Sequence, residues 1–302
     1  MALHPFIIAM LDSLKGLPAL SDGSPDDARK MVAAGRVRLG EGPEMHGFKD
    51  LSIPGRSGQI PARLLMPVDS PDGVIVFFHG GGWVVGTLGD YDTYGRTLAK
   101  RTGLAVLIVD YRLAPENPYP AGLEDCEDAL KSVLSGQISD LPAGPVVVMG
   151  DSAGSNLATV CCARLSEPSS VALQVLYYPV TDHDFTRGSY KSHGTGLPLT
   201  AKDMEWFFAH YAPKDIWSDP AISPLRQVDL SGQPPAIVIT AEYDVLCDEG
   251  EAYADRLSEA GVQLSRRRVP GVTHGFIRLH PLFDVADDSV LDFSEGNPFG
   301  DV

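Results

Sequence analysis

The sequence at residues 145–156 reads Pro-Val-Val-Val-Met-Gly-Asp-Ser-Ala-Gly-Ser-Asn. Its first part is a continuous apolar run, Val146–Met149, which is typical of a strand buried on both faces of a parallel sheet. Residues 150–154 then have the form G-x-S-x-G, and a helix-length segment follows from Ser155. A strand, a sharp turn and a helix around this motif indicate a nucleophile elbow, in which only glycine fits where the backbone doubles back. The stretch therefore predicts a turn that projects the hydroxyl of Ser152 into a cleft.

The same rhythm of apolar runs and helix-length segments extends along most of the chain. The other apolar runs lie at Val74–Phe78, Leu104–Val109, Val171–Tyr177 and Ala236–Ile239. Helices are expected at Leu123–Leu134, Ser155–Leu165 and Glu249–Ala260. This alternation predicts an α/β domain with a mostly parallel, doubly wound sheet. Before it, the alternating runs Phe48–Ile53 and Ile60–Met66 flank a turn-rich segment and predict a β-hairpin.

Two segments do not follow this rhythm. Residues 1–45 have helical spacing and a helix start at Ser24, whereas residues 183–222 lack a strand-like run and hold the aromatic segment Lys202–Tyr211. Ligands bind at the carboxyl edge of such sheets, so we expect both segments to form a helical cap over that edge. An ordinary surface excursion is the alternative for the insert. With the insert set apart, the α/β core comprises residues 46–182 and 223–302, and a last helix is expected within Phe283–Val302.

A second glycine-rich motif, at residues 79–83, reads His-Gly-Gly-Gly-Trp and follows the run Val74–Phe78. Three successive glycines leave backbone N–H groups unshielded and able to point at one spot, as an oxyanion hole requires. A phosphate-binding loop is the rival interpretation. The motif lacks the G-K-[ST] ending, however, and the elbow lacks the second glycine of G-x-G-x-x-G, so nucleotide binding is disfavoured.

A serine nucleophile needs a base, and the base needs an acid to orient it. Among the eight histidines, His274 has the best position, in an expected loop, Pro270–Phe276, after the strand-like run Val262–Val269. The acid is expected at the end of a strand between the serine and the histidine, where Asp244 fits and Asp182 is the rival. We interpret Asp248, with Glu251 three residues on, as the start of the next helix.

These motifs resemble those of the bacterial hormone-sensitive-lipase-like esterases whose elbow reads G-D-S-A-G, within the α/β-hydrolase superfamily. The resemblance extends from about residue 70 to 280, and Tyr91 is one departure, where the family usually has histidine. It implies an α/β-hydrolase fold with an N-terminal cap and no cofactor. It also implies specific roles for six residues: Ser152 as nucleophile, His274 as base, Asp244 as acid, and the N–H groups of Gly80, Gly81 and Ala153 as oxyanion donors.

The expected function is that of a serine carboxylesterase that hydrolyses short-chain acyl esters through an acyl-enzyme. No extended hydrophobic lid or membrane anchor is visible, and the aromatic segment Trp206–Tyr211 is expected to close one end of the cleft. The same triad could also serve an amidase, a deacetylase or a lactonase. A catalytically silent small-molecule-binding protein is the alternative from another class.

The composition excludes other partners. Lys and Arg number 24 against 40 Asp and Glu, and a formal net charge of −16 repels phosphate backbones and anionic lipids. We therefore expect no nucleic acid and no membrane among the partners, and a homodimer is left open. Four cysteines without C-x-x-C spacing or a histidine cluster predict neither a disulfide framework nor a metal site, and favour a cytoplasmic location.

Overall fold

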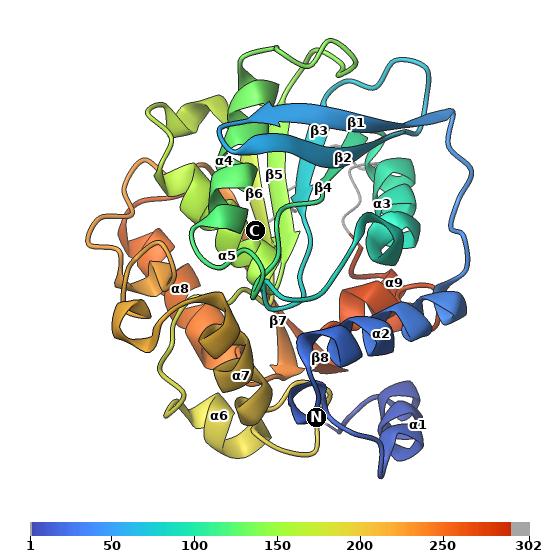
Figure 1. Cartoon of the computed structure of the whole chain (residues 1–302), viewed down its shortest axis with the longest axis vertical. Helices are drawn as coiled ribbons and strands as arrows, with labels where there is room; N and C mark the ends of the chain where they lie inside the picture. Colours follow the sequence, from blue (N-terminus) through green and yellow to red (C-terminus); the bar gives the residue numbers. More distant parts are fainter. Residues whose placement is uncertain (1, 291–302) are drawn as a thin grey trace.

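The computed structural model describes residues 2–290, which fold around an eight-stranded sheet (Figure 1). The strand order is β1-β2-β4-β3-β5-β6-β7-β8. The pairs β1–β2 and β2–β4 are antiparallel, and all the other pairs are parallel. The bounds of the strands are β1 Gly47–Gly55, β2 Gly58–Met66, β3 Val74–Phe78, β4 Ala105–Val109, β5 Val146–Asp151, β6 Leu173–Tyr177, β7 Ala236–Tyr243 and β8 Leu264–Thr273.

The apolar runs form the strands that the sequence predicts, because strands covered on both faces exclude water from every side chain. All five residues of β3 are buried. Val76 belongs to the hydrophobic cluster that contains Leu157, whereas Phe77 belongs to the cluster on the other face, with Leu98. The predicted hairpin is also confirmed, with Gly55 paired to Gly58 at its turn.

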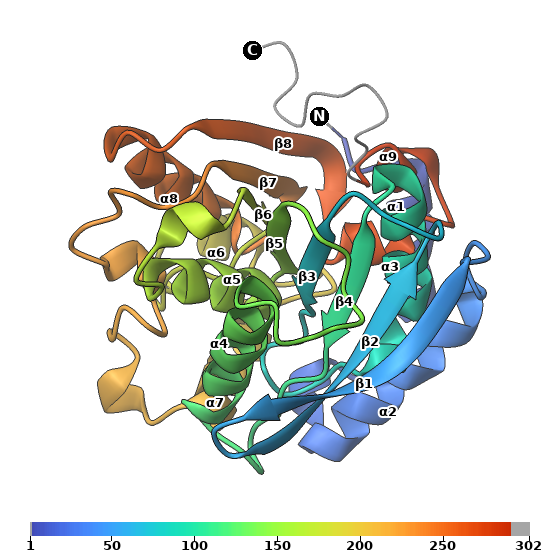
Figure 2. The same ribbon diagram turned by 90° about the horizontal axis from the view of Figure 1, so that it is seen from above.

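Helices cover both faces of the sheet (Figure 2). Helices α4, α5 and α8 pack on one face, and α3 and α9 lie on the other. The bounds of the helices are α1 Pro5–Leu14, α2 Pro25–Arg36, α3 Leu88–Thr102, α4 Ala121–Leu134, α5 Ala153–Ala163, α6 Gly188–His193, α7 Ala201–Tyr211, α8 Cys247–Glu259 and α9 Asp284–Asp287.

Helices α1, α2, α6 and α7 gather at the end of the sheet toward which the parallel strands point (Figure 1). Two hydrogen bonds join the segment between α1 and α2 to helix α7. The Ser21 N–H donates to Asp203 Oδ1 at 3.0 Å, and Lys202 Nζ donates to Asp22 Oδ1 at 2.7 Å. Helix α2 begins as predicted, because Ser24 and Asp27 form a capping box in front of Pro25. Segments about 180 residues apart in the chain thus lie together over the carboxyl edge of the strands.

Three details differ from the sequence predictions. Asp248 is not the cap of α8, because the helix already begins at Cys247 after Leu246. The segment expected to be a loop from Pro270 onward instead continues β8 as far as Thr273. The helix expected within Phe283–Val302 is the short α9, and residues 291–302 lie outside the described part of the chain.

Candidate active site

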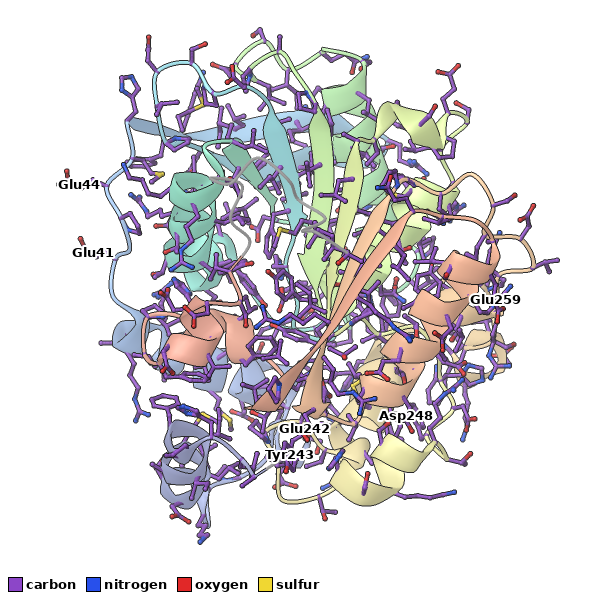
Figure 3. All side chains as sticks on the ribbon, turned by 180° about the vertical axis from the view of Figure 1, so that it is seen from behind. Glu41, Glu44, Glu242, Tyr243, Asp248 and Glu259 are labelled. Carbon is purple, nitrogen blue, oxygen red and sulfur yellow. The ribbon has the colours of Figure 1, made fainter. Side chains whose placement is uncertain are left out.

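The carboxyl ends of the parallel strands bring the predicted site residues to one edge of the sheet. Strand β5 ends at Asp151, directly before Ser152, and β8 ends at Thr273, directly before His274. Strand β7 ends at Tyr243, directly before Asp244. Figure 3 shows Tyr243 at the end of β7 and Asp248 at the start of α8.

The turn after β5 has the backbone shape of a nucleophile elbow. Ser152 adopts φ 54° and ψ −120°, which is unusual for a residue with a side chain. A Cβ atom at Gly150 would overlap the backbone of Gly154, and a Cβ atom at Gly154 would overlap the carbonyl group of Phe78. The two glycines of the motif therefore permit the close approach of β5, α5 and β3 that aims the serine side chain.

Three of the predicted residues form one hydrogen-bonded chain. His274 Nε2 lies 2.9 Å from Ser152 Oγ, and His274 Nδ1 lies 2.7 Å from Asp244 Oδ2. Asp244 is only 1% exposed, and its Oδ1 accepts the Leu246 N–H at 3.0 Å. With Nδ1–H directed to the carboxylate, Nε2 is left as the acceptor for the serine proton. The arrangement can therefore deprotonate the Ser152 hydroxyl and stabilise the imidazolium that forms.

The ring of Tyr178 supports the histidine from one side. The centroids of the Tyr178 and His274 rings are 4.6 Å apart. Tyr178 directly follows β6 and has φ 34°, a conformation that side-chain-bearing residues adopt rarely. Its hydroxyl lies 3.4 Å from Asp151 Oδ2, so the same side chain contacts the base and the residue before the nucleophile.

The glycine-rich loop after β3 and the start of α5 together provide three candidate oxyanion donors, and these differ in one residue from the three that the resemblance implied. The Gly80 N–H donates to Asp151 Oδ1 at 2.6 Å, so this donor is already occupied. Within residues 2–290, the N–H groups of Gly81, Gly82 and Ala153 donate to no protein acceptor. We therefore replace Gly80 by Gly82 in the candidate set. The sequence does not reveal this choice, because all three glycines look alike until the partner of each N–H is known.

Asp151 is a buried carboxylate that sequence reasoning did not assign. Besides Gly80 it contacts the Tyr91 hydroxyl, 3.2 Å from Oδ2, and burial raises the pKa of this carboxyl group above its ordinary value. Tyr91 stands where the resembling family usually has histidine, and it thereby gives Asp151 a hydroxyl partner. The only signal in the sequence is the position of Asp151 beside the nucleophile.

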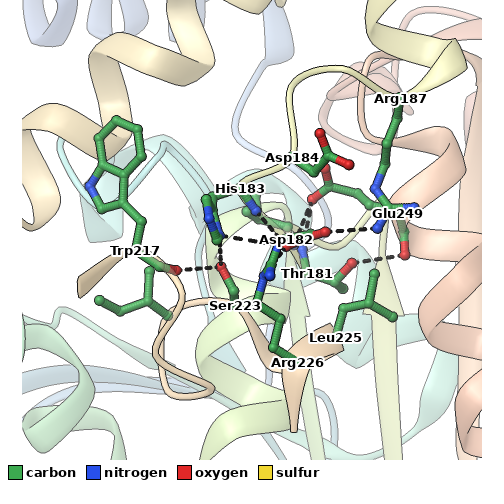
Figure 4. A network of polar contacts seen from close by, with 12 residues as sticks. Thr181, Asp182, His183, Asp184, Arg187, Trp217, Ser223, Leu225, Arg226 and Glu249 are labelled. Carbon is green, nitrogen blue, oxygen red and sulfur yellow. Dashed lines mark hydrogen bonds and ion pairs between the residues drawn. The ribbon is translucent and has the colours of Figure 1, made fainter. Parts of the chain in front are cut away.

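Asp182, the rival acid, has no contact with His274. Its carboxylate receives one hydrogen bond from Arg187 and one from Arg226, each at 2.7 Å, as Figure 4 shows. The N–H groups of Thr181 and Asp182 donate to Oε1 of Glu249, which is fully buried. Asp182 thus connects the start of the cap insert, at Arg187, with the 3-10 segment Pro224–Arg226 that follows the insert.

An apolar cleft of about 570 Å³ has His274 in its wall. Apolar side chains from α1, α2 and the segment between α6 and α7 form most of the lining, including Leu11, Val32 and Leu197. Asp203 is the α7 residue in this lining. The aromatic residues of α7 were expected to close one end of the cleft, but they pack on the glycine-rich loop instead. The rings of Trp83 and Tyr211 are stacked with their centroids 4.2 Å apart.

Residues 2–290 contain no group of three or more His, Cys, Asp or Glu side chains that could hold a metal ion. In the same range, no helix is long and apolar enough to cross a membrane. All four cysteines are buried and unpaired, as their spacing predicts.

Comparisons with known proteins agree with this geometry. A family model described as the alpha/beta hydrolase fold matches residues 75–278. The chain is 41% identical over 254 residues to the carboxylic ester hydrolase LipN of Mycobacterium tuberculosis, covering 80% of this chain and 67% of that protein. It is 35% identical to the ethyl acetate hydrolase of Pseudomonas putida, covering 96% of this chain and 97% of that protein. Among solved structures, a hyperthermophilic esterase from Pyrobaculum calidifontis has a TM-score of 0.89 and 37% identity, covering 96% of each chain.

Proposed function

The chain belongs to the hormone-sensitive-lipase-like esterases of the α/β-hydrolase fold family and is a carboxylic ester hydrolase, and we propose that it cleaves short-chain acyl esters through an acyl-enzyme on Ser152. The observation that carries the proposal is the hydrogen-bonded chain from Ser152 through His274 to Asp244. Cytoplasmic location remains a prediction from the sequence, which leaves a homodimer open.

The first half of the reaction forms the acyl-enzyme. His274 Nε2 takes the proton of Ser152 while Oγ attacks the ester carbonyl carbon, and Asp244 stabilises the imidazolium. The negative charge that develops on the carbonyl oxygen is stabilised by the N–H groups of Gly81, Gly82 and Ala153. The tetrahedral intermediate then collapses, His274 gives its proton to the leaving alcohol oxygen, and the alcohol departs.

The second half hydrolyses the acyl-enzyme by the same route. His274 takes a proton from a water molecule as the water oxygen attacks the acyl carbon, and the same three N–H groups stabilise the second oxyanion. Collapse returns the proton to Ser152 Oγ and releases the carboxylic acid. No group outside this set of residues is required by the chemistry.

The packing around the glycine-rich loop supports a short acyl chain. A Cβ atom at Gly82 would overlap the ring of Phe207, so the cap insert lies directly on this loop. The rings of Trp83, Phe208 and Tyr211 fill the space behind it, with Trp83 and Phe208 centroids 5.2 Å apart. Each methylene of an acyl chain adds about 0.8 kcal/mol of transfer free energy only while it finds apolar surface to cover.

A series of p-nitrophenyl esters of increasing acyl length tests this proposal. We expect the maximum of kcat/KM between acetyl and hexanoyl, and labelling of Ser152 by a fluorophosphonate probe that stops turnover. A maximum of kcat/KM at dodecanoyl or longer would contradict the preference for short acyl chains. Labelling that is absent from an actively hydrolysing enzyme would contradict the acyl-enzyme on Ser152.

A further inference from the structure

Arg278 lies one helical turn beyond the base and lines the same cleft as His274. Gly275 adopts φ 76°, and the short 3-10 segment Phe276–Leu279 turns the side chain of residue 278 back toward the cleft. Two other charged residues line this otherwise apolar cleft. The Asp203 carboxylate accepts hydrogen bonds from the Ser21 N–H and from Thr200, the cap of α7. Lys15 pairs with Asp12 on the exposed rim.

The guanidinium of Arg278 uses few of its five N–H donors. Within residues 2–290 its sole hydrogen bond is a long one, from Nη2 to the Asp90 carbonyl oxygen at 3.4 Å, and its buried Nε–H has no protein acceptor. Its Cζ lies 4.7 Å from the centroid of the Tyr91 ring, a cation–π contact that stabilises the charge without using a donor. The side chain is therefore held in place while its hydrogen-bonding capacity remains available.

The charges around Arg278 indicate what kind of acceptor would bind its unused N–H donors. Burial of the Arg278 guanidinium opposes its charge, but Tyr91 and the nearby carboxylates of Asp151 and Asp90 favour it and raise the pKa of Arg278. A carboxylate on a ligand would be repelled by these two groups. A neutral carbonyl oxygen accepts the hydrogen bond without that repulsion, so the surroundings favour a ketone or a second ester carbonyl.

The direction of proton transfer indicates which part of the substrate would carry this carbonyl. His274 gives its proton to the leaving oxygen, so the alcohol part of the ester leaves on the side of His274. The apolar cleft with His274 in its wall lies on that side, and Arg278 lies in the same wall. An alcohol that extends into the cleft therefore meets apolar side chains and one cationic group with free donors.

We propose that Arg278 determines the specificity for the leaving alcohol, by donating a hydrogen bond to a neutral carbonyl oxygen on an otherwise apolar alcohol chain. The preferred substrates are then short-chain esters of keto- or acyl-substituted alcohols instead of simple alkyl esters. This inference rests on the proposed function, because the role of His274 places the alcohol in the cleft.

The test compares matched pairs of acetate esters within each enzyme. The alcohols are straight chains of five, six and seven carbons with a ketone at the penultimate carbon, and each is paired with the plain alkyl acetate of the same length. In the wild type we expect kcat/KM to be about tenfold higher for the keto ester at the best length, because a hydrogen bond to a charged donor is lost in the plain ester. In Arg278→Met the ratio should fall to about one.

Two variants serve as controls, and the ratio itself cancels differences in the fraction of folded enzyme. Lys15→Met removes the other cation that lines the cleft and should leave the ratio unchanged. Arg278→Lys keeps the charge but loses the Nε donor and should give an intermediate ratio, which decides the question if the methionine variant fails to fold.

The possible failures are distinguishable. If the wild type hydrolyses neither member of any pair, the proposed function itself fails and this inference with it. If it hydrolyses both members of every pair equally, or if Arg278→Met keeps the wild-type ratio, the function stands and the role of Arg278 is overturned. A third set of acetate esters, whose alcohols carry a carboxylate in place of the ketone, tests the preference for a neutral acceptor. If these esters are hydrolysed faster than the keto esters, that preference is overturned.

Discussion

Ser152 has a backbone conformation that costs about 1–3 kcal/mol for a residue with a side chain. Three hydrogen bonds hold it there. The Ser152 N–H donates to the Tyr177 carbonyl at 2.9 Å, and the N–H groups of Asn156 and Val180 donate to the Ser152 carbonyl at 3.1 and 3.4 Å. Since these partners belong to β6, α5 and the segment after β6, the rigid core imposes the orientation that brings Oγ to His274.

Replacement of the nucleophile gives the first prediction at this scale. Ser152→Ala should lose about 10⁵- to 10⁶-fold in kcat, because the base has no hydroxyl to activate and the triad acts as a unit. The backbone contacts of residue 152 do not involve Oγ, so the circular dichroism spectrum and the melting temperature should remain near the wild type. Esterase activity above a tenth of the wild-type value would exclude Ser152 as the nucleophile.

The two candidate acids give the second prediction. Asp244→Asn should lose at least about a hundredfold in kcat, because an amide leaves the imidazolium unsupported and favours the wrong tautomer. Asp182→Asn should stay within about tenfold in kcat, because Asp182 contacts Arg187 and Arg226 and not the base. It should instead lower the melting temperature, since two arginines lose a buried charged partner. The reverse ranking of the two kcat values would identify Asp182 as the acid.

At the scale of elements, the sequence predicts what local patterns control and misses what distant partners control. The strands follow from apolar runs, and the start of α2 follows from Ser24 and its neighbours, because both signals act within a few residues. Asp248 matches the local pattern of a helix cap, yet its carboxylate accepts the N–H of Ser189 in the cap insert at 2.8 Å. Likewise, the partner of Gly80 is Asp151 on another strand. No spacing rule identifies such long-range partners.

The start of α8 gives the third prediction. Burial raises the pKa of Glu249 to about 8 in the folded chain, against an ordinary value of 4.5. The folded chain thus holds a proton that the unfolded chain releases, so the wild type loses stability as the pH rises from 4.5 to about 8. A glutamine side chain does not ionise in this pH range, so Glu249→Gln removes this pH dependence. Relative to the wild type, the unfolding free energy of Glu249→Gln should therefore increase by about 2 kcal/mol between about pH 6 and pH 8, as measured by urea denaturation.

A second glutamate of the same helix is the matched control. Glu251 pairs with Arg268, which lowers the pKa of its carboxyl group, so it is ionised throughout this range. The difference in stability between Glu251→Gln and the wild type should be the same at both pH values. If Glu249→Gln also shows a constant difference, the carboxyl group of Glu249 does not hold its proton in the folded chain.

At the scale of the whole molecule, two buried histidines affect the unfolding free energy in the opposite direction to Glu249, because they lower it as the pH falls. Burial lowers the pKa values of His79 and His280 to about 4, against an ordinary value of 6.5. Below pH 6.5 the two imidazoles are therefore protonated in the unfolded chain but remain neutral in the folded chain. The folded chain loses stability as the pH falls from 6.5 toward 4. Glu249 causes the loss on the alkaline side. The melting temperature should consequently be highest between about pH 6 and pH 7. The unfolding free energy should fall by about 1 kcal/mol on going to about pH 5, because the loss from the two histidines exceeds the gain from Glu249 over the same range.

Two histidine variants check this fourth prediction. His280→Gln removes one of the two buried groups and should flatten the acidic side of the curve. His46→Gln changes a histidine that is 54% exposed and should leave the shape of the curve unchanged. A melting temperature that rises steadily from pH 6.5 to pH 8.5 would contradict the assignment of Glu249, and one that rises as the pH falls from 6.5 to 5 would contradict the assignment of the histidines.

The cleft combines α1 and α2 with a segment near residue 200, and its chemistry needs His274. On the ribosome these parts emerge in that order, so the first helices leave the exit tunnel long before Asp203 exists to bind Ser21. Their apolar side chains, including Leu11 and Val32, have no cleft to line during that interval and are exposed to chaperones and to other nascent chains. A translating ribosome thus carries a chain without a substrate site until His274 has left the exit tunnel, and hydrolysis begins only after that point.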